Sequence, residues 1–218
     1  MKLRMMTATI LFVAVIAFCR AGEQPRRFPL ELEVLATNAS RLMSPLYTPR
    51  YKQGLRLRMA GSLGYLNFLA RGYLQARGRP GKHLLDRITH LRQLFGQGKW
   101  RAFAQQSRML ADEYPFAMTG LDPERADVQA IASGRHIYRQ LCMGCHEHPD
   151  TSQAVPAPDL FDMARTEPGR ELIARLITGV HGTPAVALRN PFSNREIAGL
   201  AAYLKSHAKT SLPAGMRH

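Results

Sequence analysis

The sequence predicts an all-helical protein, with an antiparallel bundle of about four helices in its first half and a second helical unit after it. Apolar residues recur at helical spacing, as at Leu84, Ile88, Leu91 and Phe95, and no segment alternates at the spacing of a strand. Glycine and proline breakers divide the first half into segments of helix length. Hydrophobic residues make up 45% of the 218 residues, which indicates a folded chain rather than a disordered one.

The helices of the first half are expected, in order, at about 30–43, 52–77, 84–95 and 100–114. The segments between them are short and rich in glycine or proline, and the Gly-Arg-Pro-Gly at 78–81 is the clearest break. Short connections make consecutive helices antiparallel neighbours, so a small bundle is the simplest packing.

The positive charge of the chain is concentrated in this first half. The whole chain has 30 Lys and Arg against 16 Asp and Glu, but residues 22–120 hold 16 basic and 6 acidic residues and residues 121–218 hold 11 and 10. This drop in net positive charge predicts a domain boundary near Asp122 and Pro123. Asp122 suits the N-cap of a helix and Pro123 suits its first position. The basic side chains form either a solvated surface or a docking face for an acidic partner protein or an anionic membrane.

The N-terminus has the pattern of a secretory signal peptide. Lys2 and Arg4 precede an apolar run at 5–18, and small residues allow cleavage after Ala21. The run is short for a bilayer span, and an uncleaved anchor is the alternative. We therefore expect a periplasmic protein with no nucleic acid partner. The expected divisions are a signal peptide at 1–21, a basic helical bundle at 22–121, a second helical domain at 122–209 and a tail at 210–218.

Residues 142–146 read Cys-Met-Gly-Cys-His, the C-x-x-C-H pattern of covalent c-type haem attachment. Two thiols three residues apart on one helical turn, Cys142 and Cys145, can each add to a vinyl group of the same porphyrin. The imidazole of His146 then lies against the porphyrin face and can reach the iron as an axial ligand. A redox C-x-x-C would need a βαβ surrounding and a zinc site a second ligand pair, and the sequence contains neither pattern.

Around this motif, residues 122–209 resemble the small single-haem class I cytochrome c domain. In that family's first helix a glycine and an aromatic residue precede the first cysteine, as Gly134 and Tyr138 do here. The resemblance implies that Gly134 lets the last helix cross closely and that Tyr138 packs at this crossing, beside the cofactor. It also implies that the carbonyl of Pro158, in a Pro-x-Leu, accepts a hydrogen bond from His146 and fixes its ring.

The end of the chain fits the same resemblance. The segment 197–206 is similar to the family's last helix, and Ser193 with Glu196 forms a capping box that opens it. Another helix is expected at about 167–178, closing at Gly179.

The distal ligand departs from the family's pattern, in which a methionine from the loop before the last helix binds the iron. Here Thr183 or Ala185, depending on the alignment, stands in its place. His181 is the strong ligand in this loop, so we expect bis-histidine coordination by His146 and His181, which lowers the reduction potential relative to Met/His coordination. The alternatives are an empty sixth site and coordination by Met163.

These residues predict an exported electron carrier with one covalently bound haem c rather than an enzyme. Its basic surface would steer it to an acidic docking face on a redox partner protein. One alternative is a five-coordinate haem c that binds a small ligand or peroxide, and another is a haem subunit of a larger respiratory complex. Candidate partners of the haem propionates are Arg139, Arg165 and Arg189.

Overall fold

The computed structural model describes residues 24–153, 155–179 and 190–207, and every regular element in these ranges is a helix. The predicted all-helical class is confirmed. The predicted signal peptide, the loop that contains His181 and the tail at 210–218 lie outside the described residues. None of the helices in the described ranges is both long and apolar enough to cross a bilayer.

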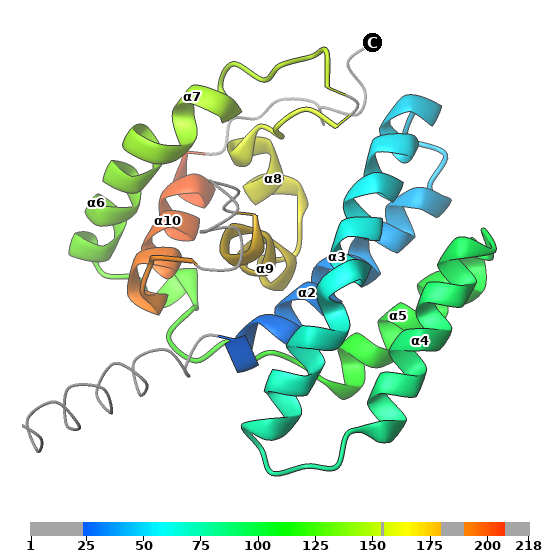
Figure 1. Cartoon of the computed structure of the whole chain (residues 1–218). Coiled ribbons are helices and arrows are strands. Elements are labelled where there is room, and N and C mark those ends of the chain that lie inside the picture. The colour runs from blue at the N-terminus through cyan, green and yellow to red at the C-terminus, as the bar shows by residue number, and fades with distance from the viewer. Residues whose placement is uncertain (1–23, 154, 180–189, 208–218) are drawn as a thin grey trace, which may run out of the picture.

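The helices form two groups (Figure 1). The bundle consists of α2 (Gln24–Met43), α3 (Pro49–Gln75), α4 (Lys82–Gly96) and α5 (Trp100–Glu113). The second group consists of a short 3₁₀ turn η1 (Pro123–Arg125), α6 (Val128–Ile137), a π-helical turn η2 (Tyr138–Cys142), α7 (Met143–His146), α8 (Leu160–Thr166), α9 (Gly169–Thr178) and α10 (Asn194–Ser206).

Helix α2 begins before the predicted start at residue 30 and runs through Pro29. A proline removes a backbone donor and is poorly tolerated beyond the first turn of a helix. Burial of Phe28 offsets this cost, because its ring is fully buried with centroids 5.1 Å from Tyr73 and 5.8 Å from Tyr114. Tertiary packing therefore extends the helix past the point where its local sequence favours a break.

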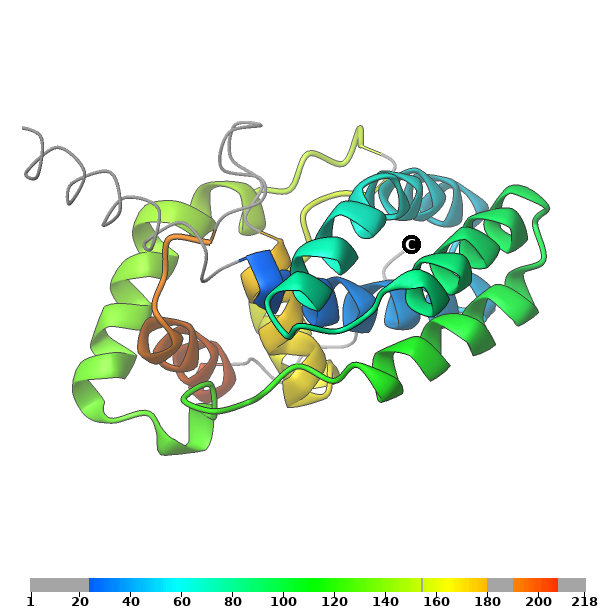
Figure 2. The ribbon, with the colours of Figure 1, turned by 60° about the horizontal axis from the view of Figure 1, so that its bottom comes forward.

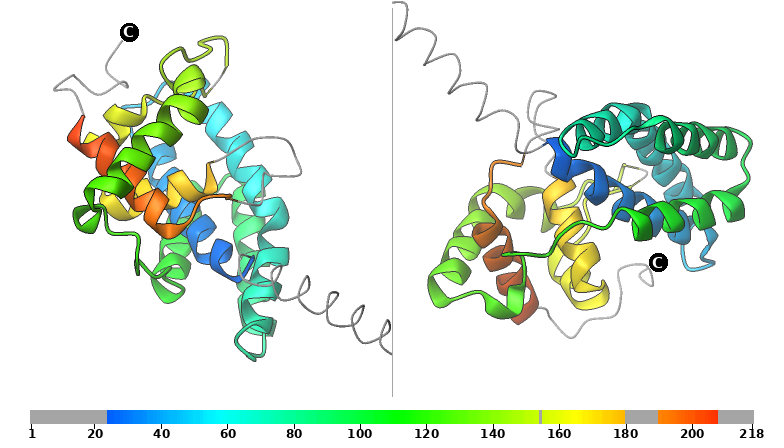
Figure 3. Two further views of the ribbon diagram at one scale, coloured as in Figure 1. Left: turned by 90° about the vertical axis from the view of Figure 1, so that its left-hand side faces the viewer. Right: turned by 90° about the horizontal axis from the view of Figure 1, so that it is seen from below.

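Two hydrophobic cores share helix α2. Phe28 and Leu32 belong to the core of the bundle, whereas Leu30 packs into the second core with Leu172 of α9 and Leu200 of α10. Figure 3 shows α2 lying between α9 and the remaining helices of the bundle. The bundle and the second group are therefore packed against each other through a common helix.

Helices α6 and α10 cross at two glycines. A Cβ atom on Gly134 would lie 2.3 Å from the backbone carbon of Gly199, and one on Gly199 would lie 2.0 Å from the carbonyl oxygen of Ala130. Only glycine leaves room for backbones this close. The close crossing that the resemblance implied at Gly134 is confirmed, and so is the capping box of Ser193 and Glu196 at the start of α10.

Ion pairs join α2 to α9 along their contact. Arg41 lies 2.7 Å from the Glu171 carboxylate, and Arg175 lies 2.7 Å from the same oxygen while also donating to Asn38 at 2.8 Å. Arg41 also pairs with Glu167, whose pKa is raised by burial. Because these charges are largely buried and share partners, they fix the register of the two helices.

A buried ion pair lies at the start of α2. Arg27 and Glu31 are 4% and 3% exposed, and the Arg27 Nε donates to the carboxylate at 3.0 Å. A second nitrogen of Arg27 donates to the carbonyl of Thr178, at the end of α9, at 3.1 Å. Burial raises the pKa of Glu31, and the charge of Arg27 opposes this shift.

Replacing Arg27 with methionine should lower the free energy of unfolding by about 3–5 kcal/mol at neutral pH, because Glu31 would remain buried without a cation. The loss should shrink in mildly acidic buffer. Without Arg27 the folded-state pKa of Glu31, already raised by burial, rises further. A carboxyl with a raised folded-state pKa is protonated in the folded protein at mildly acidic pH and costs little there, whereas it destabilises the fold as the pH rises through that pKa. Urea unfolding at both pH values measures the effect. The Arg27→Met/Glu31→Met double variant should lie nearer the wild type, and a double variant no more stable than the single one would contradict the argument.

Candidate functional site

Helix α6 leads directly to the C-x-x-C-H segment. The Asp127 side chain caps α6 by accepting from Ala130 N at 2.8 Å, and it pairs with Arg195 of α10 at 2.9 Å. After Ile137 the helix widens into the π-helical turn η2, which ends at Cys142. π-Helical turns are rare in proteins as a whole, and those that occur are often found at functional sites. The Asp127 cap and the glycine crossing thus hold α6 in place. The π-helical turn η2 then determines the direction in which the chain presents Cys142 and Cys145.

Cys142 and Cys145 are both free thiols, and they lie on the turn of η2 and α7. Cys142 packs against the second core, whereas Cys145 is exposed. Burial raises the pKa of the Cys142 thiol, so this group carries its proton at neutral pH. The pair therefore presents one half-buried and one open sulfur from neighbouring turns.

His146 and Pro158 are joined by a hydrogen bond of 2.6 Å between the imidazole Nδ1 and the proline carbonyl oxygen. A carbonyl can only accept, so Nδ1 is the donor of this hydrogen bond and Nε2 is the ring nitrogen left for another partner. Asp159 follows immediately and caps α8 by accepting from Phe161 N at 2.8 Å and Asp162 N at 3.2 Å. The start of α8 therefore fixes the segment that presents the carbonyl.

Tyr138, the first residue of η2, is 2% exposed and packs against α8 and α10. Its ring is 4.9 Å from Phe161 of α8 and 5.7 Å from Tyr203 of α10. Its hydroxyl donates to the Glu147 carboxylate at 3.0 Å, and burial raises its pKa well above the usual range. Tyr138 thus ties η2 to α8, to α10 and to the residue after His146.

The structure describes three of the other predicted candidates. Met163 is 8% exposed within the second core. Arg165 pairs with Asp162 at 3.6 Å and Arg139 is exposed. The distal candidates His181, Thr183 and Ala185, and the propionate candidate Arg189, lie outside the described residues.

Sequence reasoning missed the arginines of α3 that contact the loop between α7 and α8. Arg50 donates to the carbonyl of Ser152, and Arg58 donates to the carbonyl of Val155 at 2.6 Å. The sequence places Arg58 on the polar face of a bundle helix, and Arg50 precedes the predicted start of that helix. Their partners are backbone carbonyls far along the chain, which no sequence motif marks.

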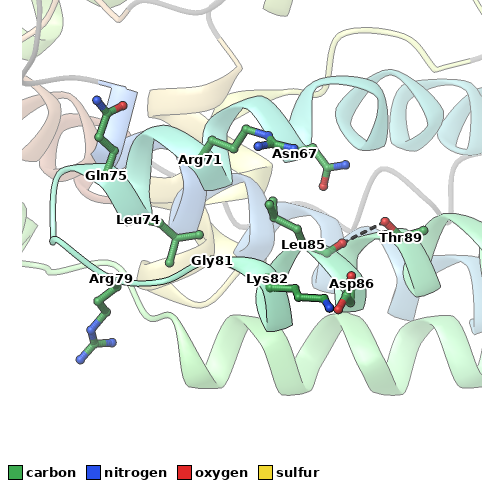
Figure 4. A pocket seen from close by; sticks show the side chains of 10 residues that line it. All are labelled: Asn67, Arg71, Leu74, Gln75, Arg79, Gly81, Lys82, Leu85, Asp86 and Thr89. Carbon is green, nitrogen blue, oxygen red and sulfur yellow. Dashed lines mark hydrogen bonds between the residues drawn. The ribbon is translucent and has the colours of Figure 1, made fainter.

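A cavity of about 810 Å³ opens between α3 and α4 (Figure 4). Its lining comes from residues 67–89 of the bundle, and Figure 4 shows Arg79 directed away from Lys82 and Asp86. Every lining residue lies on α3, on α4 or in the turn between them, so this cavity does not belong to the site at Cys142 and His146.

Residues 129–204 match the family model described as cytochrome C oxidase, cbb3-type, subunit III. The match covers less than half of the chain, lies inside the 122–209 resemblance and takes in the elements from α6 to α10. No curated protein and no solved structure gave a significant match to the chain. Domains of this type carry covalent haem c, transfer electrons to or from a redox partner and are usually extracytoplasmic. Residues 129–204 are therefore a cytochrome c domain of the cbb3 subunit III type, preceded by an unassigned helical region.

Proposed function

We propose that the protein is an exported electron carrier in which Cys142 and Cys145 hold one haem c covalently and His146 and His181 are its axial ligands. The observation that carries this proposal is the His146–Pro158 hydrogen bond, 2.6 Å long, beside two free thiols on the same stretch of helix. Bound haem c supplies a one-electron couple between ferric and ferrous iron.

The two cysteines have the chemistry that the attachment needs. A thiol adds across a vinyl group by forming a carbon–sulfur bond at one vinyl carbon and passing its proton to the other. Cys142 and Cys145 are free and are carried on consecutive turns, so they can reach two substituents of one macrocycle. Tyr138 and the glycine crossing hold the helix that carries them.

His146 is prepared as the proximal ligand by its neighbour. Its Nδ1–H donates to Pro158, which fixes the tautomer and the ring orientation and leaves Nε2 free to bind iron. Donation to a carbonyl also makes the ring a stronger electron donor, which favours the ferric state. Residues of this chain thus arrange the proximal side of the proposed site.

The proposed distal ligand rests on the sequence. His181 stands in the loop where related domains present a methionine, and that loop contains no methionine. Two imidazoles keep the iron six-coordinate in both oxidation states, which suits electron transfer without ligand exchange. Export through the N-terminal signal peptide, with cleavage near Ala21, would bring the chain to the compartment where bacteria attach haem c.

Replacing His181 with alanine should convert the ferric protein from low-spin to high-spin, which electronic and EPR spectra report. The reduced wild type should resist carbon monoxide, and the variant should bind it rapidly, because an axial position is then open. His148→Ala removes an exposed imidazole close to the proximal ligand and should change neither property. A variant that stays low-spin would remove His181 as a ligand. A wild type that is high-spin and binds carbon monoxide at once would instead favour a ligand-binding or catalytic haem.

We place the docking face for the acidic partner around the end of α6. Leu141 and Met143 are 67% and 36% exposed beside the attachment cysteines, and Arg135 and Arg139 are exposed nearby in sequence. An apolar centre with a basic rim suits brief, electrostatically steered encounters. Part of the bundle's positive charge is neutralised by an ion pair within the bundle, as where Arg87 pairs with Glu113.

A further inference from the structure

We propose that Arg58 of α3, assisted by Arg50, is a positioning residue that holds the 147–158 loop so that Pro158 meets His146, and thereby lowers the reduction potential of the domain. This inference rests on the proposed function, since it assumes that His146 binds the haem iron. It gives the bundle a role in the redox site.

The contacts come from one helix and reach one loop. Arg58 donates to the carbonyl of Val155 at 2.6 Å, and Arg50, about two turns earlier on α3, donates to the carbonyl of Ser152. Val155 is itself buried, at 8% exposure. Figure 2 shows the loop reaching from α7 across to α3 before it returns to α8.

Apart from the burial of Val155, the two arginines make the long-range contacts of the described residues in the middle of the loop. Its other described hydrogen bonds are local, such as Ser152 N to the Asp150 carboxylate at 2.9 Å, or lie at its two ends, where Tyr138 meets Glu147 and His146 meets Pro158. Val155 precedes Pro158 by only three residues. A change in the path of the chain at Val155 is therefore passed on to the direction of the Pro158 carbonyl.

Helix α3 is a firm support for this contact. Arg92 of α4 donates to the carbonyl of Leu63, in the middle of α3, at 2.9 and 2.6 Å from two of its nitrogens. Helix α2, which packs on α3, is joined to α9 of the cytochrome domain by the Arg41–Glu171 and Arg175–Glu171 ion pairs. The bundle and the domain are thus held together at α9 as well as at the loop.

Loss of the loop contact and loss of the Arg58 charge change the reduction potential in opposite directions. Removing a nearby positive charge stabilises the ferric state and lowers the potential. Releasing the loop weakens the hydrogen bond from His146 to Pro158, makes the imidazole a poorer donor and raises the potential. The sign of the change in Arg58→Gln therefore distinguishes a positioning role from a charge at a distance.

The test uses the full-length haem-loaded protein with Arg58→Gln and with Arg50→Gln/Arg58→Gln. Potentiometric titration should show a higher reduction potential in the variants than in the wild type. Their equilibrium with a reference mediator should shift about three- to tenfold toward the reduced protein, and a tenfold shift corresponds to 59 mV for one electron. Hydrogen exchange should show faster exchange of the amides in 147–158, by about tenfold or more, with the double variant more affected. Arg71→Gln removes the same charge from an exposed position on α3 and should leave loop exchange unchanged.

A potential that falls or stays constant in Arg58→Gln, together with unchanged exchange in the loop, would overturn the proposal. If Arg58→Gln does not fold, Arg58→Lys is the substitute, because lysine keeps the positive charge but loses the reach of the guanidinium. Its reduction potential should rise, since no charge is lost to oppose the effect of the released loop. Failure of the proposed function would look different. A wild-type protein without covalent haem would refute the cofactor assignment, while exchange in the loop would still show whether Arg58 holds it.

Discussion

Replacing Gly134 with alanine should destabilise the cytochrome domain by about 3 kcal/mol or more, which exceeds the usual cost of one added methyl group in a core. The new Cβ would lie 2.3 Å from the Gly199 carbon and equally close to Leu200 N, both backbone atoms of α10. A side chain could rotate away, but these atoms move only if the whole helix moves. Separation of α6 from α10 would also disturb the C-x-x-C-H segment that follows α6.

Thermal unfolding followed by circular dichroism measures this effect, and Gly61→Ala is the matched control. Gly61 lies within α3, and a Cβ placed there would meet no atom within 4 Å. Removing a glycine from an exposed helix interior should stabilise the protein by roughly 0.5–1 kcal/mol. If Gly134→Ala proved as stable as the wild type, the close crossing of α6 and α10 would be wrong.

The Cys142→Ser/Cys145→Ser double variant should contain no covalently bound haem. Serine keeps the size and the helix of the native residue but lacks the thiol that adds to a vinyl group. Haem staining after denaturing electrophoresis, and extraction with acidified acetone, measure covalent attachment. The wild type should keep its pigment under both treatments.

Single variants and a control sharpen this prediction. Cys142→Ser and Cys145→Ser should each leave one thioether bond, with an absorption maximum shifted from that of the wild type. Cys19→Ser lies within the predicted signal peptide and should change nothing in the mature protein. Full retention of pigment in the double variant would refute attachment through these cysteines.

Local signals predicted much of the cytochrome domain. The capping box of Ser193 and Glu196 was recognisable because its two partners are three residues apart, and α10 begins there. The resemblance to the cytochrome c family's first helix implied a close crossing at Gly134, and the crossing lies at that glycine. The family resemblance implied the pairing of His146 with Pro158, and the imidazole Nδ1 and the proline carbonyl oxygen lie 2.6 Å apart.

The boundaries of the bundle and the roles of its charges were harder to predict. Helix α2 starts before Pro29 because Phe28 packs against Tyr73 and Tyr114, which come from other helices. Arg58 had the same appearance as any arginine on a polar helix face. Its partner is the carbonyl of Val155, and every residue type offers a carbonyl.

The amino-acid sequence by itself determined the helical class and the C-x-x-C-H motif, because both depend on residue types at short, fixed spacings, and the family resemblance implied the pairing of His146 with Pro158. Tertiary structure alone decided that α2 serves two cores, that Arg27 holds the end of α9 and that Arg58 holds the loop before Pro158. The physical reason is that these contacts join backbone atoms or apolar surfaces of segments far apart in the chain. Such contacts depend on how whole helices pack, and they leave no local pattern in the sequence.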